Sequence, residues 1–290
     1  MTNLVSVIIV NYNKQPYTEL CLRSLLQTDY EPFEIIAIDN GSTDGTVETL
    51  REIQRECADR SMRCELILND SNVGACTARN QGMEIARGGY MSFMDNDVAV
   101  RGPKWMTKLR AALDEADDIA ICGPKLVFPF APYDIEFGGC EVSPNGRIKY
   151  RGRGEPYAAP EYNERREVQC LISATWLMKA RLVQEIGVLD EVFNPAQYED
   201  LDYCYRARER GYRILYEPSA ELYHFESVTT DGSVNVNYRY ITIKNGLEFK
   251  RRWQHVFSHE NGPPDSECQW RQLETRPLAV TGPPPIASDL

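Results

Sequence analysis

Residues 89–97 read GYMSFMDND, a short apolar run that ends in two carboxylates one residue apart. Residues i and i+2 of a strand point to the same side, so Asp95 and Asp97 can both face one ligand beyond the carboxyl end of the strand. Two carboxylates held this close repel each other unless a cation or hydrogen-bond donors compensate them. The pattern therefore suits a site for a metal ion and a diphosphate, although Asp-Asn-Asp alone also suits a simple turn.

The composition is that of a globular protein with one large domain or two small ones, since 42% of its 290 residues are hydrophobic and 26% are charged. The net charge is −11, and no segment is densely basic, which argues against nucleic acid or an anionic membrane as the main partner. The chain opens without a signal-peptide pattern, and no apolar run approaches the roughly 20 residues that span a bilayer. We therefore expect a cytoplasmic protein without a transmembrane segment.

Strand and helix patterns alternate through the N-terminal part of the chain. Apolar runs predict strands over residues 5–10, 33–38, 64–68, 89–94 and 118–122. Apolar residues at helical spacing follow each of the first four runs. Repeated β–α units of this length imply a parallel sheet covered by helices, and such sheets bind ligands outside the carboxyl ends of their strands.

Polar clusters stand at four of these strand ends. They are Asn11-Tyr12-Asn13, Asp39-Asn40-Gly41-Ser42, residues 69–74 (NDSNVG) and Asp95-Asn96-Asp97. The chain has neither a Gly-x-Gly-x-x-Gly fingerprint nor a P-loop, so a dinucleotide or P-loop nucleotide site is not predicted. The clusters instead predict a different polar ligand site at this edge of the sheet.

In order and spacing, these blocks, together with Ala78-Arg79-Asn80-Gln81-Gly82, resemble the family 2 glycosyltransferases, in their soluble, rhamnosyltransferase-like branch. The resemblance covers roughly the first 225 residues and implies a GT-A type α/β fold. This fold has a mostly parallel, Rossmann-like sheet flanked by helices and a smaller mixed β region on the acceptor side. We accordingly expect a nucleotide-sugar-binding half at 1–123, an acceptor-side half at 124–255 and a flexible proline-rich tail at 256–290.

The resemblance also implies roles on the donor side. Tyr12 and Asp39 would hold the nucleotide base, Asp95 the ribose, and Asp97 a divalent cation, Mn²⁺ or Mg²⁺. His224, at the end of a later apolar run, would complete the cation site, although a single histidine there can also be structural. The other donor-side candidates are Asn11, Asn13, Asn72, Gly74, Arg79 and Asn96, of which Arg79 would help to neutralise the diphosphate.

The acceptor side is expected from two further segments. Residues 171–178 (LISATWLM) carry Trp176, which is either a platform for a sugar or acceptor ring or a core tryptophan. Residues 198–212 (YEDLDYCYRARERGY) predict a helix that begins with carboxylates and ends with arginines, and a well-capped helix is one interpretation. By resemblance, Asp200 is the general base, with Glu199 beside it to orient the acceptor or to replace it. Asp202 lies roughly 200° around the helix from Asp200, so we expect it to pair with arginines instead.

Together these expectations describe an inverting glycosyltransferase that moves a sugar from a nucleotide-diphosphate sugar to an acceptor by one metal-assisted displacement. The acceptor could be a glycan, a lipid-linked precursor, a small molecule or a peptide. Two other classes stay open at this point, namely a nucleotidyltransferase on a related α/β fold and a non-catalytic nucleotide-sugar-binding protein. A pyrophosphate assay separates the first of these from a glycosyltransferase, and a turnover assay separates the second.

Overall fold

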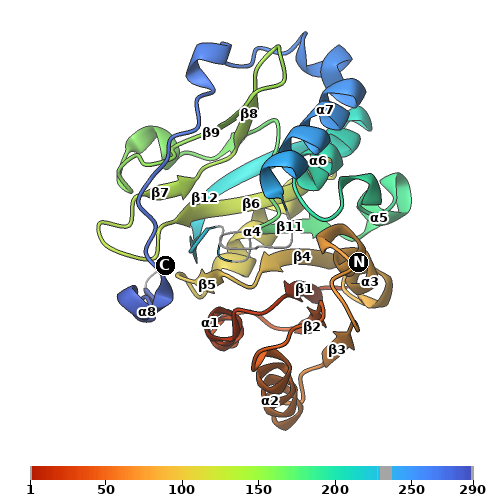
Figure 1. The fold of residues 1–290 in the computed structure, drawn as a ribbon, viewed down its shortest axis with the longest axis vertical. Coiled ribbons are helices and arrows are strands. Elements are labelled where there is room, and N and C mark those ends of the chain that lie inside the picture. The colour runs from red at the N-terminus through yellow and green to blue at the C-terminus, as the bar shows by residue number, and fades with distance from the viewer. Residues whose placement is uncertain (1, 227, 229–236, 289–290) are drawn as a thin grey trace.

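The computed structural model describes residues 2–226, 228 and 237–288, and one ten-stranded sheet runs through them (Figure 1). Its strands are β1 (Val5–Asn11), β2 (Phe33–Asp39), β3 (Cys64–Leu68), β4 (Tyr90–Asp95), β5 (Val98–Val100), β6 (Ile119–Val127), β7 (Ile135–Phe137), β10 (Arg166–Glu167), β11 (Thr175–Lys179) and β12 (Arg213–His224). The strand order is β10-β12-β6-β11-β4-β1-β2-β3, with β5 paired to β12 and β7 paired to β6. Strands of both predicted halves therefore share one sheet.

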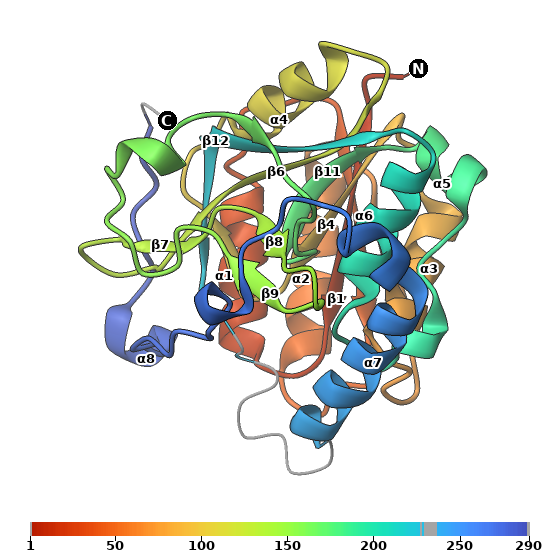
Figure 2. The same cartoon turned by 90° about the horizontal axis from the view of Figure 1, so that it is seen from above.

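Neighbouring strands are parallel through β4, β1, β2 and β3, and again between β6 and β12. Strand β11 lies between these groups and is antiparallel to both β4 and β6. The helices are α1 (Gln15–Leu25), α2 (Thr46–Asp59), α3 (Ala75–Ile85), α4 (Trp105–Asp114), α5 (Arg181–Ile186), α6 (Glu199–Glu209), α7 (Tyr238–Phe257) and the short α8 (Leu278–Thr281). In Figure 2, α3, α5, α6 and α7 gather on one side of the molecule. The predicted mostly parallel sheet flanked by helices is confirmed.

Two strand predictions differ from the structure. The strand predicted at 118–122 extends to Val127, because β6 pairs with β11 and β12 on its two sides and all nine of its residues are buried. The sequence also predicts a strand at 135–142 followed by a turn at 144–146, and this strand is divided at Gly138-Gly139, where Gly139 has a φ of +101°. Its first part, β7, joins the large sheet, and its second part, β8 (Cys140–Val142), forms a two-stranded sheet with β9 (Ile148–Tyr150) across the predicted 144–146 turn.

The chain after α7 runs back across β8 and β9 (Figure 2). Ser143 Oγ donates to Asp265 Oδ1 at 2.6 Å, and Lys149 Nζ lies 2.9 Å from Glu267 Oε2.

The sequence predicts an amphipathic helix over 234–253. Residues 234–236 lie outside the described part of the chain, and α7 accounts for the rest. The flexibility expected of residues 256–290 stays a prediction. Among the described residues, no helix is both long and apolar enough to cross a membrane.

Candidate active site

The carboxyl ends of β1, β2 and β4 open into a cavity of about 830 Å³. Its walls come from both halves of the chain, because the start of α6, the hairpin β8–β9, helix α7 and residues 268–270 also reach it. The predicted site residues that line it are Tyr12, Asn72, Arg79, Asp95, Asn96, Asp97, Glu199, Asp200 and His224. The cavity is thus the place where the predicted donor side and the predicted base meet.

Asp95, Asp97 and His224 form one cluster in this cavity, and their ligand atoms all lie within 4.8 Å of one another. The register of β12 against β5 brings this about, since His224 lies opposite Val98, the residue after Asp97. Phe225 N–H also donates to the carbonyl of Asp97 at 3.0 Å, and His224 Nε2 lies 3.5 Å from Asp97 Oδ1. Two carboxylates and an imidazole are a donor set that suits Mn²⁺ or Mg²⁺, so the residues fit the expected cation.

Glu136 contacts this cluster through His224, and it is not among the predicted site residues. Its Oε2 lies 3.2 Å from His224 Nδ1, and its side chain is buried on β7. Burial opposes a charged imidazole, but Asp97 and Glu136 outweigh it and raise the pKa of His224 well above its ordinary value. A carboxylate that fixes the second ring nitrogen is a common partner of a metal-binding histidine. No local motif marks Glu136, because its role depends on strand pairing.

Arg79 joins the cation cluster to the start of α6. One guanidinium nitrogen lies 2.6 Å from Asp95 Oδ1, and the other lies 2.8 Å from Glu199 Oε1. The second oxygen of Glu199, Oε2, is buried and has no hydrogen-bond partner within the residues described. Burial, followed by the charge of Asp200, raises the pKa of Glu199 to about 7. Arg79 therefore pairs with two carboxylates, Asp95 and Glu199, at the wall of the cavity.

Asp200 is held by backbone groups instead of by a cation. Its Oδ2 accepts a hydrogen bond from Ser173 N–H at 3.1 Å, and its Oδ1 accepts one from Leu201 N–H at 2.8 Å. The described part of the chain offers it no ion-pair partner within 4 Å. Burial raises its pKa, against the opposing effect of these two N–H groups. The result is a fixed carboxylate on the cavity wall whose oxygens are free of a counter-ion.

Some of the other donor-side candidates line the cavity, and others form hydrogen bonds between strand ends. Asp39 Oδ2 accepts from Gly41 and Ser42 N–H, while its buried Oδ1 has no partner in the described structure. Asp39, Asn11 and Asn13 are not among the residues that line the cavity, and their contact with the donor stays a prediction. Asn11 Nδ2 bonds the carbonyls of β1 and β2, and Asn13 Oδ1 accepts from Thr43 N–H, because both side chains are needed to join the two strand ends.

Gly74 and Asn96 have their own local roles. Gly74 does not line the cavity, and it has a φ of +91° at the start of α3. A Cβ atom there would lie 2.4 Å from Asn194 Oδ1, so this position requires glycine. Asn96 lines the cavity and donates to Thr18 Oγ1 at 3.0 Å, which ties the Asp95–Asp97 turn to α1.

The structure places Trp176 in the core, not on the acceptor side. Its exposed fraction is 0%, and its ring lies between those of Phe93 and Tyr203, with centroid distances of 5.6 and 6.3 Å. A tryptophan without exposed surface cannot serve as a platform for a ligand. The prediction of an acceptor-side Trp176 is therefore wrong, and the alternative of a core tryptophan is correct. The cause is the position of β11 inside the sheet between β4 and β6, where all five of its residues are buried.

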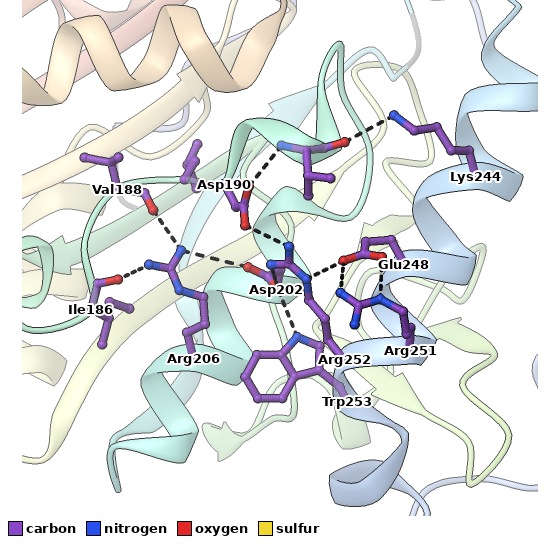
Figure 3. A network of polar contacts seen from close by, with 12 residues as sticks. Ile186, Val188, Asp190, Asp202, Arg206, Lys244, Glu248, Arg251, Arg252 and Trp253 are labelled. Carbon is purple, nitrogen blue, oxygen red and sulfur yellow. Dashed lines mark hydrogen bonds and ion pairs between the residues drawn. The ribbon is translucent and has the colours of Figure 1, made fainter.

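Asp202 pairs with cations behind α6, as predicted from its position on the helix. It is fully buried, accepts from Trp253 Nε1 at 2.9 Å and lies 3.3 Å from Arg252 Nη1. Figure 3 shows this carboxylate among Arg206, Arg252 and Trp253, with Arg252 reaching on to Glu248 and Asp190. The network joins α6 to α7 and has no direct part in the cavity.

Replacing Asp202 with alanine should therefore destabilise the fold without reaching the cavity directly. We expect the free energy of unfolding to fall by about 2–4 kcal/mol, because the change leaves Trp253 Nε1 buried without an acceptor and removes one of the three carboxylates that pair with Arg252. Urea denaturation of the purified protein measures this difference. Glu209→Ala, an exposed position on the same helix, is the matched control, and an equal loss in both variants would contradict the role given to the network.

Comparison with known proteins adds to this geometry. The uncharacterized protein y4gI of Sinorhizobium fredii is 29% identical over 262 residues, which is 87% of this chain and 28% of that protein. The uncharacterized glycosyltransferase YibD of Escherichia coli is 37% identical over 127 residues, 44% of this chain and 36% of YibD. The chain thus spans about a third of the length of these relatives.

Solved glycosyltransferases share the fold. GalNAc-T7, crystallised with UDP, GalNAc and Mn²⁺, superposes with a TM-score of 0.70 at 18% identity, covering 87% of this chain and 49% of that one. The mannosyltransferase PcManGT of Pyrobaculum calidifontis, in complex with GDP-Man and Mn²⁺, has a TM-score of 0.56 at 15% identity, covering 86% of this chain and 75% of that one. These likenesses establish the GT-A fold. The glycosyl transferase family 2 profile matches residues 6–186, more than half of the chain, and the protein therefore belongs to this family.

Proposed function

We propose that this glycosyltransferase inverts the anomeric configuration of a sugar as it moves it from a nucleotide-diphosphate sugar to an acceptor, with the help of a divalent cation. One observation carries the proposal. A single cavity contains both the Asp95–Asp97–His224 cluster and the Asp200 carboxylate, and Arg79 with Glu199 forms the link between them. A site of this kind brings a leaving-group stabiliser and a base to one reaction centre.

Asp95, Asp97 and His224 would hold Mn²⁺ or Mg²⁺, which, when bound, supplies positive charge that stabilises a departing diphosphate. Tyr12, on the cavity wall, would stack on the nucleotide base, and the unpartnered Oδ1 of Asp39 would accept a hydrogen bond from it. Asp95 would also reach the ribose. The nucleotides and Mn²⁺ in the structures of GalNAc-T7 and PcManGT support this donor class.

Asp200 would take the proton from the acceptor hydroxyl as that oxygen attacks the anomeric carbon from the face opposite the leaving group. One displacement of this kind inverts the configuration and needs no covalent intermediate on the enzyme. Asp200 is favoured over Glu199 because Glu199 is already in an ion pair with Arg79, whereas Asp200 has no ion-pair partner within 4 Å among the described residues. Arg79 would hold its charge near the diphosphate, and Glu199 would fix the position of Arg79.

The buried carboxylates predict an acid limb in the pH profile. A base acts only when it is deprotonated, and burial raises the pKa of Glu199 to about 7 and raises that of Asp200 as well. We therefore expect kcat/KM for nucleotide-sugar turnover to be constant above about pH 7 and to fall as the pH drops through the raised pKa values of this pair. A base with the ordinary pKa of an aspartate would remain deprotonated down to roughly pH 4. A kcat/KM that stays constant down to that pH would therefore contradict a buried carboxylate as the base.

Product analysis tests the proposed function against its two alternatives. The wild-type protein is incubated with Mg²⁺ and a panel of UDP-, GDP- and dTDP-sugars, and separately with nucleoside triphosphates and sugar phosphates. We expect a nucleoside diphosphate from the first reactions and no pyrophosphate from the second. Pyrophosphate release would indicate a nucleotidyltransferase. A nucleotide-dependent rise in melting temperature without any turnover would indicate a binding protein.

A further inference from the structure

The C-terminal chain supplies a tryptophan to the wall of the cavity. Trp270 lines the cavity and is 57% exposed. The other three tryptophans, Trp105, Trp176 and Trp253, are 0%, 0% and 6% exposed. An indole that is open at a cavity wall can be covered by a ligand, which removes its apolar surface from water.

The ring of Trp270 is held in place from one side. The guanidinium of Arg153 lies 4.0 Å from the ring centroid, and the ring of Tyr150 meets it edge-on at 5.3 Å. Arg153 Nε also donates to the carbonyl of Arg271 at 3.0 Å, which fixes the neighbouring backbone. The cation covers one face of the indole and leaves more than half of the residue exposed. This is the arrangement of a prepared stacking surface.

The same arginine connects this surface to the cation cluster. Arg153 Nη1 lies 3.3 Å from Glu136 Oε1, and the other oxygen of Glu136 lies 3.2 Å from His224 Nδ1. Arg153 Nη2 lies 2.9 Å from Glu226, whose side chain also lines the cavity. Arg153 and Glu136 therefore connect the Trp270 ring to the candidate reaction centre. The Glu226 carboxylate, which can accept hydrogen bonds from hydroxyl groups, also lines the cavity.

We propose that Trp270 is the platform for a sugar ring of the acceptor, so that the acceptor is a carbohydrate. This inference rests on the proposed function and deepens it. The apolar C–H face of a pyranose stacks on an indole, and its hydroxyl groups need acceptors such as Glu226. A lipid chain would need a continuous apolar wall, whereas the cavity around Trp270 carries charged side chains, among them Arg147 and Lys250. The C-terminal segment is then a part of the acceptor site.

Saturation-transfer NMR with methyl glycosides tests the platform on the full chain. The probes are the methyl α- and β-glycosides of glucose, galactose, mannose, rhamnose and N-acetylglucosamine, each with and without UDP and Mg²⁺. We expect at least one glycoside to bind, and its dissociation constant to rise roughly three- to tenfold in Trp270→Ala, with a smaller change in Trp270→Phe, which keeps an aromatic face. Tyr240→Ala is the matched control, because Tyr240 is 62% exposed on α7 and does not line the cavity.

A second readout does not depend on any variant. Trp270 is the exposed tryptophan, so a bound glycoside should reduce quenching of the wild-type fluorescence by acrylamide. The inference is overturned if no glycoside binds the wild type, if binding is unchanged in Trp270→Ala, or if quenching is unaffected by a glycoside that binds. Nucleoside-diphosphate thermal shifts are measured on the same samples. If nucleoside diphosphates do not shift the melting temperature of the wild type, this counts against the proposed function. If they do, but no glycoside binds in a way that depends on Trp270, only this inference is overturned.

Discussion

Asp200→Asn is expected to lower kcat for nucleotide-sugar turnover by about 10²–10⁴-fold, the range that a general base contributes. The variant retains the size of the side chain but cannot take a proton from the acceptor. Asp200 lies on the cavity wall with two backbone N–H groups fixing its oxygens, so the loss should fall on kcat and leave nucleotide binding nearly unchanged. Steady-state kinetics, with calorimetric titration of the nucleoside diphosphate, separate these two effects.

Glu199→Gln is the matched comparison, because it removes the neighbouring charge on the same turn of α6. We expect a smaller loss of kcat there, since the proposed task of Glu199 is to hold Arg79 at 2.8 Å. A larger loss in Glu199→Gln than in Asp200→Asn would transfer the role of base to Glu199. Wild-type turnover in Asp200→Asn would show that neither the assignment nor the proposed proton transfer is correct.

Asp97→Asn is expected to weaken binding of Mn²⁺ by roughly 100-fold or more, beyond the 10–100-fold typical for loss of an outer-shell partner. The substitution removes one of the two carboxylates of the cluster and the charge that faces His224 Nε2 at 3.5 Å. Turnover should fall in parallel, and added Mn²⁺ should restore part of it. Mn²⁺ binding is measured directly by electron paramagnetic resonance, independently of activity.

Asp117→Asn provides the control for this change, because its side chain is 96% exposed and lies outside the cavity. It should bind Mn²⁺ and turn over substrate as the wild type does. If Asp97→Asn bound Mn²⁺ with wild-type affinity, the cation would not lie at this cluster. If chelation of all divalent cations left turnover unchanged, the proposed metal assistance would be wrong.

Most of the donor half could be predicted from local sequence. The strands β1, β2 and β4 follow from apolar runs buried on both faces, and β3 is the partly buried edge strand beside β2. The parallel arrangement brings the polar carboxyl ends of these strands to one edge. This is why Asp95 and Asp97 could be expected in one site. His224 is distant in sequence, and its place in the site was predicted only from the family resemblance. The register of β12 against β5 explains its position.

The remaining features depend on contacts that local patterns do not encode. The sequence around Trp176 suits a core tryptophan and a ligand platform equally. Its burial follows from the position of β11 between β4 and β6 in the sheet. Glu136 is an isolated acid in a short strand, and its contact with His224 joins residues 88 positions apart. Trp270 lies in a segment whose proline content suggests a flexible tail, yet its ring meets Tyr150 on the hairpin. Long-range pairing is thus the missing information in each case.

The most direct test of the central claim is proton NMR of nucleotide-sugar turnover by the wild-type protein with Mg²⁺, recorded before the free sugar or product can equilibrate. We expect release of a nucleoside diphosphate and a first-formed product whose anomeric configuration is opposite to that of the donor. Chelation of the cation should stop both signals. A product with retained configuration, or no nucleoside diphosphate from any donor of the panel, would contradict the central claim.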